Sequence, residues 1–454
     1  MELKPYIFRE YDVRGVYGKD LDASVAETLG RAYATFFRKR EARGKIVVGR
    51  DCRVSGPDLH RGLIKGLTES GMTVVDVGVV ATPVQYFSIF HTDAAGGIQI
   101  TGSHNPPDHN GFKISFGKTT LHGHEIQELL KICQEGKFVT GRGSVQPLDL
   151  TEAYLTALLG RLRMPERKLK IVVDGGNGMG GPYAVPLLRR MGHDVIDQYC
   201  EADGRFPHHH PDPTVEKNVE PLISRVMAEK ADLGIAFDGD ADRIGVVDNK
   251  GNILWGDKLM ILYSRSVLKE VPGAAVVGEV KCSQTLYDDI AKHGGEAIMW
   301  KAGHSLIKAK MKEADAALAG EMSGHIFFRH RYYGFDDAIY AAGRLVELLS
   351  EAGKPVSELL ADVPVTYATP ELRVDCEEHL KFKLVQKCVE HFRKKHDVVD
   401  VDGVRVLFPD GWGLIRASNT QPILVLRFEA QSQARLEEIR AYMERELTSL
   451  RQTL

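Results

Sequence analysis

One local pattern occurs three times in this 454-residue chain and limits what it can fold into. Each copy has two short β-rich runs separated by a helix-length stretch, followed by a third run that ends in a polar loop. Strands that alternate with helices favour βαβ units in parallel or mixed sheets, so three related α/β domains are predicted. The copies are KIVVGRD, GMTVVDVG and GGIQITGSHN (45–105), LKIVVDGGNG, MGHDVIDQY and ADLGIAFDGDADR (169–243), and AAVVGEVKCS, GGEAIMWKAGH and DAALAGEMSGH (274–325).

The pattern changes near residue 365. A helical segment, KFKLVQKCVEHFRKK, is followed by VVDVDGVRVLF with an Asp-Gly turn, by GWGLIRASNTQPILVLRFEA, and by the amphipathic SQARLEEIRAYMEREL. These features predict a fourth domain of α+β type. We expect domain I at 1–149, domain II at 150–252, domain III at 253–364 and domain IV at 365–454. The alternative is that short apolar runs recur by chance in any α/β protein.

Charge and hydrophobicity exclude several classes of partner. The net charge of −3 gives no basic excess for nucleic acid or anionic lipid, so an anionic ligand must be held by locally placed cations. No run of 18 apolar residues occurs, and six cysteines lack a C-x-x-C pair, which is typical of reduced thiols. We expect a cytoplasmic protein without a nucleic-acid or membrane partner, as a monomer or weak homodimer.

The segment TGSHNPPDHNGFKI (101–114) places Ser103 just after the strand-like run GGIQI. Two prolines exclude helix and stiffen the loop, and strand C-termini carry the chemistry of α/β folds. Four roles for Ser103 compete. They are a dyad with His104, a structural turn, a hydroxyl that binds substrate, and a serine that itself carries a phosphoryl group. Adjacent residues of an extended chain point to opposite faces, which disfavours the dyad, and only the last role uses every polar loop.

The loop DGDADR (238–243) carries carboxylates at Asp238, Asp240 and Asp242. In an extended chain this spacing puts all three on one side, and oxygen ligands of this charge suit Mg²⁺. An EF-hand is excluded because Arg243 stands at the sixth position and Asn249 at the twelfth. A solvated acidic turn is the alternative interpretation.

Two further loops offer groups that bind sugar phosphates. RASNTQP (416–422) has a guanidinium, two hydroxyls and an amide, which suit a phosphate dianion, although a plain Asn-Ser-Pro turn would look similar. GEMSGH (320–325) has a carboxylate, a hydroxyl and an imidazole between glycines, which suit sugar hydroxyls. A glycine-flanked loop with an incidental histidine is the alternative there.

With FREYDVRG (8–15), DGRFPHHHPDP (203–213), WKAGHSLIK (300–308) and YYGFDDAIY (332–340), these loops resemble the α-D-phosphohexomutase superfamily, in its phosphomannomutase/phosphoglucomutase branch. The resemblance covers essentially the whole chain. It implies a heart-shaped four-domain α/β architecture, with three related mixed α/β domains and a C-terminal α+β domain. It also implies reversible phosphoryl transfer between hexose 1-phosphate and hexose 6-phosphate, of mannose or glucose, through a bound hexose 1,6-bisphosphate.

The resemblance also assigns roles by motif position. Ser103 is then the phosphoserine and a Mg²⁺ ligand together with Asp238, Asp240 and Asp242. The phosphosugar is bound by Glu321, Ser323, His325, Arg416, Ser418, Asn419 and Thr420, and the transfer centre is surrounded by Arg14, Lys113, Arg243, Lys281 and His304.

Three questions stay open at the level of sequence. Lys113, His304 and Lys281 are all candidates for moving the proton, and a desolvated lysine beside cations would titrate low enough to do so. Met322 offers no group that separates glucose from mannose, so dual specificity is our hypothesis. A phosphatase and a non-catalytic phosphosugar sensor are the competing functions. The phosphatase motif, however, wants Thr or Val where Asp242 stands.

Overall fold

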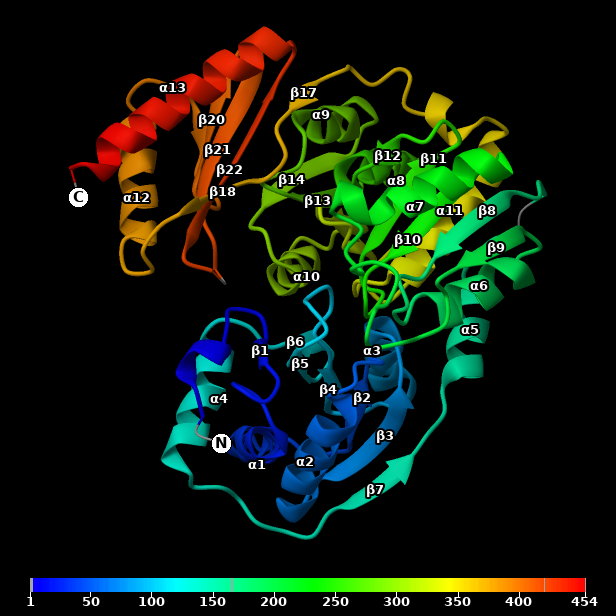
Figure 1. Cartoon of the computed structure of the whole chain (residues 1–454), viewed down its shortest axis with the longest axis vertical. Coiled ribbons are helices and arrows are strands. Elements are labelled where there is room, and N and C mark those ends of the chain that lie inside the picture. Colours follow the sequence, from blue (N-terminus) through cyan, green and yellow to red (C-terminus); the bar gives the residue numbers. More distant parts are fainter. Residues whose placement is uncertain (1–2, 165, 420, 454) are drawn as a thin grey trace.

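The computed structural model describes residues 3–164, 166–419 and 421–453. Its four sheets follow one another along the chain, with domain I at the bottom of Figure 1, domain II at the right, domain III at the upper centre and domain IV at the upper left. Each predicted domain thus contains one sheet, except that β12 (Ile253–Leu254) lies just after the predicted boundary at 252 and pairs with β11 in the domain II sheet. The four-domain α/β architecture expected from the sequence is confirmed.

The threefold pattern is present in the strand order. Domain I contains the order β3-β2-β4-β5, domain II the order β9-β8-β10-β11, and domain III the order β14-β13-β15-β16. In each set the first three strands are parallel and the fourth is antiparallel to the third. The antiparallel fourth strand was not part of the sequence pattern. It turns each predicted polar loop into the connection between two neighbouring strands.

Domain I adds edge strands to this unit, and helices pack on its sheet. Its elements are η1 (Pro5–Ile7), β1 (Val13–Val16), α1 (Ala23–Lys39), β2 (Ile46–Arg50), α2 (Gly56–Glu69), β3 (Thr73–Val79), α3 (Thr82–His91), β4 (Gly96–Ile100), β5 (His109–Phe116), β6 (Thr119–Thr120), α4 (His124–Glu135) and β7 (Ser144–Pro147). Domain II has α5 (Thr151–Leu159), β8 (Lys170–Asp174), α6 (Gly181–Arg190), β9 (Asp194–Gln198), α7 (Glu216–Glu229), β10 (Leu233–Phe237), β11 (Ile244–Asp248) and β12 (Ile253–Leu254).

Domain III has α8 (Gly256–Glu270), β13 (Ala275–Glu279), α9 (Gln284–Lys292), β14 (Glu296–Trp300), α10 (His304–Glu313), β15 (Leu318–Gly320), β16 (Ile326–Phe328), α11 (Ala338–Ala352) and η2 (Val356–Glu358). Domain IV is an antiparallel sheet, and the hairpin predicted at its Asp-Gly turn joins β19 to β20. Its elements are β17 (Tyr367–Ala368), β18 (Leu372–Asp375), α12 (Lys381–Phe392), β19 (Val398–Val399), β20 (Val404–Phe408), β21 (Gly411–Ala417), β22 (Ile423–Ala430) and α13 (Gln433–Arg451).

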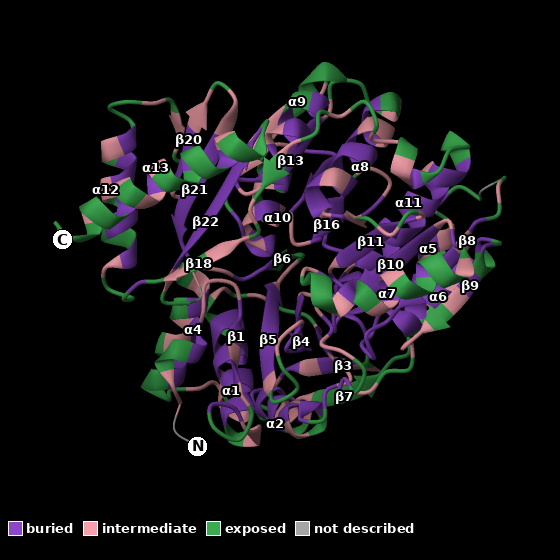
Figure 2. Ribbon diagram, turned by 45° about the horizontal axis from the view of Figure 1, so that its top comes forward, coloured by how far each residue is buried: buried purple, intermediate pink, exposed green. Residues whose placement is uncertain are grey.

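Burial follows the sheets, whose central strands are buried while the outer helices expose one face (Figure 2). One apolar core runs through domains I, II and III, and domain IV has a separate core beneath α12 and α13. All six cysteines lie in the described part of the chain and are free thiols, as expected. Among the described residues, no helix is both long enough and apolar enough to cross a membrane.

Candidate active site

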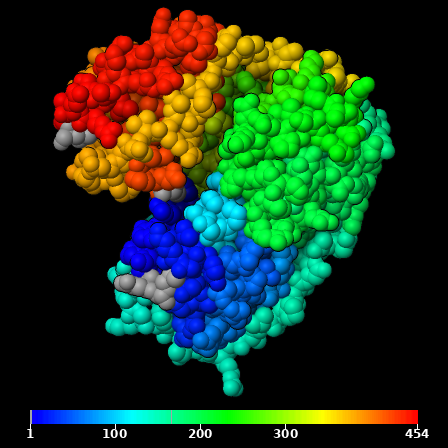
Figure 3. Space-filling view, in the orientation of Figure 1, coloured from blue at the N-terminus to red at the C-terminus, as the bar shows by residue number. Residues whose placement is uncertain are grey.

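The four predicted polar loops face one another across a single cleft. Figure 3 shows the surface hollowed between domain IV and domain I. Side-chain contacts link the domains around it: Ser103 to Asp238, Arg243 to His325, and Tyr11 to Asn419. These contacts join domain I to II, II to III, and I to IV. Loops from distant parts of the sequence therefore share one site.

Ser103 sits in the loop between β4 and β5 and is 2% exposed. Its Oγ donates to Asp238 Oδ2 at 2.7 Å and lies 3.1 Å from His104 Nδ1. The expectation that Ser103 and His104 point to opposite faces is wrong, because Ser103 has a φ of 48° and the chain there is not extended. The left-handed residue turns both side chains toward the same space.

The acidic loop is a tight turn after β10. Ala241 has a φ of 62°, and the backbone amides of Asp242 and Arg243 both donate to Asp238 Oδ1 at 3.1 Å. The expectation of an extended chain is therefore wrong for this loop. The three carboxylates of Asp238, Asp240 and Asp242 nevertheless converge, with ligand atoms within 4.8 Å of one another, because the turn brings them together.

This carboxylate cluster fits a divalent cation. Asp240 Oδ1 and Asp242 Oδ1 are buried and accept no hydrogen bond among the described residues. Burial and the two neighbouring carboxylates raise the pKa of Asp238 well above its ordinary value. Buried carboxylate oxygens are costly without a partner, so the donor set suits an oxygen-seeking ion such as Mg²⁺.

Lys113 lies on β5, paired in register with Gln99 of β4. Its Nζ donates to Asp240 Oδ2 at 2.8 Å and also contacts Asp242. Burial alone would lower the pKa of Lys113, but these two carboxylates hold it well above its ordinary value. The expectation that Lys113 titrates low is wrong, because its nearest neighbours are carboxylates and not cations.

Two stacked imidazoles line the domain III side of the cleft. His304 and His325 have ring centroids 5.6 Å apart, and Arg243 Nε donates to His325 Nε2 at 3.0 Å. Burial, with Lys308 adding to it, lowers the pKa of His304 well below its ordinary value. Asp336 Oδ2 lies close to both rings, 3.2 Å from His325 Nδ1 and 3.7 Å from His304 Nδ1.

The loop after β15 places Glu321 and Ser323 at the cleft. Glu321 Oε1 accepts a hydrogen bond from the Gly303 amide at 2.5 Å, and Ser323 Oγ lies 3.4 Å from Glu321 Oε2. Lys281 Nζ is 3.5 Å from Glu279 and 3.1 Å from Glu371, and these carboxylates outweigh burial and raise its pKa. Lys281 is therefore an ammonium group next to the loop that carries Glu321 and Ser323.

Domain IV contributes the loop between β21 and β22. Arg416 Nε donates to Asp402 Oδ2 at 2.9 Å, and Asp402 also accepts from the Ala302 amide of domain III at 3.1 Å. Ser418 Oγ accepts from the Gln421 amide at 3.1 Å, and Asn419 Nδ2 donates to Tyr11 Oη at 2.7 Å. Thr420, also predicted to bind phosphate, lies outside the described residues.

Arg14 lies on β1 at the edge of the serine loop, where it donates to Asn105 Oδ1 at 3.2 Å and to Asp12 at 2.6 Å. Sequence reasoning missed Tyr11, Arg53 and Asp336. Tyr11 and Asp336 stand inside motifs that carried the resemblance, FREYDVRG and YYGFDDAIY. Arg53 follows β2, which neighbours β4 in the same parallel sheet, so the rule that strand C-termini converge was the signal that could have found it.

Comparison with known proteins adds independent evidence. Four family models, described as phosphoglucomutase/phosphomannomutase α/β/α domains I, II and III and the C-terminal domain, match residues 5–139, 152–251, 255–367 and 371–446. The phosphomannomutase/phosphoglucomutase of Pseudomonas aeruginosa PAO1 is 45% identical over 99% of this chain and 96% of that protein. The phosphoglucomutase of Neisseria gonorrhoeae is 46% identical over 95% of each chain. A crystal structure of a Burkholderia thailandensis phosphoglucomutase/phosphomannomutase family protein superposes with a TM-score of 0.93 at 42% identity, over 99% of this chain and 98% of that one.

Proposed function

The chain belongs to the phosphoglucomutase/phosphomannomutase family, and we propose that it interconverts hexose 1-phosphate and hexose 6-phosphate through a phosphorylated Ser103 and a hexose 1,6-bisphosphate. The observation that carries this proposal is the 2.7 Å contact between Ser103 Oγ and Asp238 at the centre of a four-loop cleft. A serine held inside an acidic cluster suits transfer of a dianionic group only if cations offset the repulsion.

The proposed phosphoryl transfer consists of two half-reactions. In the first, the phosphorus–Oγ bond of phosphorylated Ser103 breaks, a sugar hydroxyl oxygen bonds to that phosphorus, and the hydroxyl proton leaves to a base. In the second, Ser103 Oγ takes the phosphoryl group from the other end of the bisphosphate, and the proton returns to the sugar oxygen. Positioning and charge stabilisation supply most of the catalysis in such a reaction.

Asp238, Asp240, Asp242 and the serine oxygen would hold Mg²⁺, which supplies charge neutralisation for the transferred group when bound. The chain's own cations surround the same space. Lys113 is a buried ammonium group beside Asp240 and Asp242, while Arg243 reaches over the cleft to His325. We assign these two side chains to offsetting the charge of the moving group.

The proton is better assigned to the imidazoles than to the lysines. Lys113 and Lys281 both have raised pKa values beside carboxylates and stay protonated near neutral pH. His304 has a pKa lowered by burial and is neutral there, so it has a lone pair available. We therefore propose the His304–His325 pair as the site of proton transfer.

The other end of the substrate would be held by domains III and IV. In this proposal, Glu321 and Ser323 would present a carboxylate and a hydroxyl to the sugar, and Arg416, Ser418 and Asn419 would bind the distal phosphate. Relatives at similar identity carry both names, phosphomannomutase/phosphoglucomutase and phosphoglucomutase. We propose that this chain accepts both sugars, and we retain a cytoplasmic monomer or weak dimer with no nucleic-acid or membrane partner as part of the proposal.

The test combines mass and turnover. Peptide mapping should find a phosphoryl group on Ser103 after incubation with glucose 1,6-bisphosphate, and Ser103→Ala should lose mutase activity with either glucose 1-phosphate or mannose 1-phosphate. Ser264→Ala is the matched control, because Ser264 is also buried, on α8, and among the described residues its Oγ bonds only to its own helix, at Ile261 O, 3.0 Å away. Full activity of Ser103→Ala, or release of inorganic phosphate faster than isomerisation, would overturn the proposal.

A further inference from the structure

The serine loop has a buried guanidinium at its centre. Arg53 is 0% exposed, and its two terminal nitrogens donate to the carbonyl oxygens of Ser103, Asn105, Pro106 and His109 at 2.5 to 2.9 Å. A charged group of this kind is rarely buried without a dense set of acceptors. Here the acceptors are the loop's own backbone, so the loop and the arginine fix each other.

Asp51 closes this arrangement into a ring around Ser103. Arg53 Nε donates to Asp51 Oδ2 at 3.2 Å, and the same oxygen accepts from Thr101 Oγ1 at 2.7 Å. Thr101 Oγ1 in turn accepts from the Ser103 amide at 2.8 Å. The Ser103 backbone is therefore held at its amide through Thr101 and at its carbonyl through Arg53.

This ring explains how Ser103 keeps an uncommon backbone conformation. A φ of 48° is unfavourable for a residue with a side chain, and such residues persist where the surroundings over-determine them. The conformation is what aims Oγ at Asp238. Pro106 and Pro107 stiffen the loop, but the hydrogen bonds that bracket Ser103 itself come from Arg53 and Thr101.

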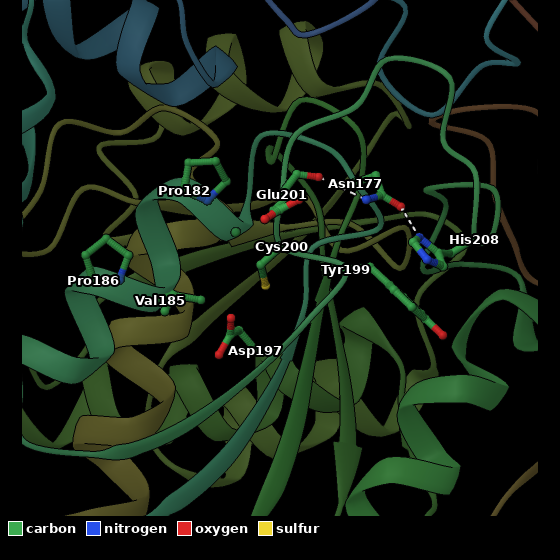
Figure 4. A pocket seen from close by; sticks show the side chains of 10 residues that line it. Asn177, Pro182, Val185, Pro186, Asp197, Tyr199, Cys200, Glu201 and His208 are labelled. Atoms are coloured by element: carbon green, nitrogen blue, oxygen red, sulfur yellow. Dashed lines mark hydrogen bonds between the residues drawn. The ribbon is translucent and has the colours of Figure 1, made fainter.

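Domain II closes over the arginine. The Phe206 ring lies 5.1 Å from the Arg53 guanidinium carbon, and Gly204 packs so tightly that a Cβ there would lie 2.3 Å from Cys52 O. Asn177 anchors this segment by accepting from the Asp203 amide at 2.8 Å and by contacting His208 Nδ1 at 2.7 Å, beside a hollow of about 490 Å³ on domain II (Figure 4).

We propose that Arg53 is a positioning residue for phosphoryl transfer, which holds Ser103 Oγ at the metal-binding loop through the loop backbone. The inference rests on the proposed function and deepens it. Among the residues that the structure describes, the hydrogen bonds, ion pair and ring contact of Arg53 reach no predicted sugar- or phosphate-binding side chain of domains III and IV. Its loss should therefore lower kcat and leave KM for the sugar phosphate nearly unchanged.

The experiment compares Arg53→Ala with the wild type, using glucose 1-phosphate and a trace of glucose 1,6-bisphosphate. We expect kcat to fall about 100-fold, the effect of a misplacement of roughly 1 Å, with KM changed less than about threefold. Millimolar guanidinium should restore part of kcat, and Arg53→Lys should recover little because an ammonium group lacks the planar fork. Hydrogen exchange should rise in 101–111.

Arg344→Met is the matched control, since Arg344 is 2% exposed on α11, donates to His330 O at 3.2 Å and has its guanidinium carbon 4.5 Å from the Phe328 ring of domain III. It should lose stability without loss of kcat. Unchanged kcat in folded Arg53→Ala, no guanidinium rescue, or an equal fall in kcat for Arg344→Met would overturn the inference. If Arg53→Ala does not fold, the kcat and exchange of Arg53→Lys decide. A wild type without mutase activity would instead refute the proposed function. Hydrogen exchange in 101–111 would still test whether Arg53 holds the serine loop, an arrangement that we call the Arg53 clamp.

Discussion

The boundaries among domains I, II and III are apolar, whereas the boundary between domains III and IV is mostly polar. Domains I, II and III share one apolar core, in which Phe87 of α3 contacts Tyr154 of α5 and Tyr333 of domain III at ring distances of 5.5 and 6.0 Å. Domain IV meets domain III through a small apolar cluster of Val280, Trp412 and Leu414 and through polar contacts. We therefore expect the first three domains to behave as one body and domain IV to be the part whose position can change.

The polar boundary is specific even though its apolar cluster is small. Arg405 of β20 donates to the carbonyls of Val280 and Cys282 at 2.7 and 2.8 Å and stacks on Trp412. Lys281, between those carbonyls, pairs with Glu371 near the start of domain IV. Hydrogen bonds of this kind are broken and remade at low cost in water, whereas separating an apolar core exposes its whole surface. Under the proposed function, movement of domain IV would let substrate enter and would let the proposed bisphosphate turn around.

The largest expected effect comes from breaking the shared core. Phe87→Ala should destabilise domains I to III by about 3–5 kcal/mol, because it removes a buried ring that touches two other domains. Phe392→Ala, its matched counterpart in the core of domain IV, should destabilise domain IV alone. Calorimetry should show two transitions that the two variants shift separately. A single transition lowered equally by both would contradict the division.

The sequence predicted the features that depend on local patterns and missed those that depend on contacts between distant segments. The parallel strand sets and the polar loops follow from local patterns, and the threefold repeat was visible because each copy repeats its own short-range signals. The left-handed Ser103 and Ala241, the ion pair of Lys113 with Asp240, and the Arg53 clamp depend on contacts between segments far apart in the chain. No local pattern encodes such contacts, so the predictions of extended loops and of a low pKa for Lys113 were wrong. The prediction that Ser103, Lys113 and the three aspartates lie in one site did not depend on those contacts and agrees with the structure.

The two parts of the molecule should also differ in how their stability depends on pH. Asp337 caps α11 inside the shared core, and burial raises its pKa from 3.8 to about 6 despite hydrogen bonds from Tyr154 and Tyr332. A carboxyl group whose pKa is raised on folding favours the fold when protonated. Stability of domains I to III should therefore fall by roughly 3 kcal/mol as pH rises from about 4 to about 6.

Glu371 should respond in the other direction, since Lys281 lowers its pKa from 4.5 to about 2. Its contribution is complete above about pH 4.5 and is lost as pH falls toward 2. Unfolding of Asp337→Asn, Glu371→Gln and the wild type between pH 2 and 8 tests both. Asp337→Asn should flatten the slope of the first three domains, and a slope identical to that of the wild type would refute this assignment.

The smallest expected effect concerns the contact that bridges three domains. Tyr11 Oη donates to Ala302 O of domain III at 2.8 Å and accepts from Asn419 Nδ2 of domain IV at 2.7 Å. Tyr11→Phe removes both bonds while keeping the ring against His304. Each of these hydrogen bonds contributes about 0.5–1.5 kcal/mol net. Because part of that free energy helps to hold domain IV closed on the substrate, their loss should raise KM for glucose 1-phosphate by about three- to tenfold. Tyr263→Phe loses a comparable buried bond, to Ala341 O at 2.9 Å, within domain III only. Tyr263→Phe should lower stability and leave KM unchanged. Equal changes in KM for both variants would show that Tyr11 acts through general stability and not by holding domain IV against the other three domains.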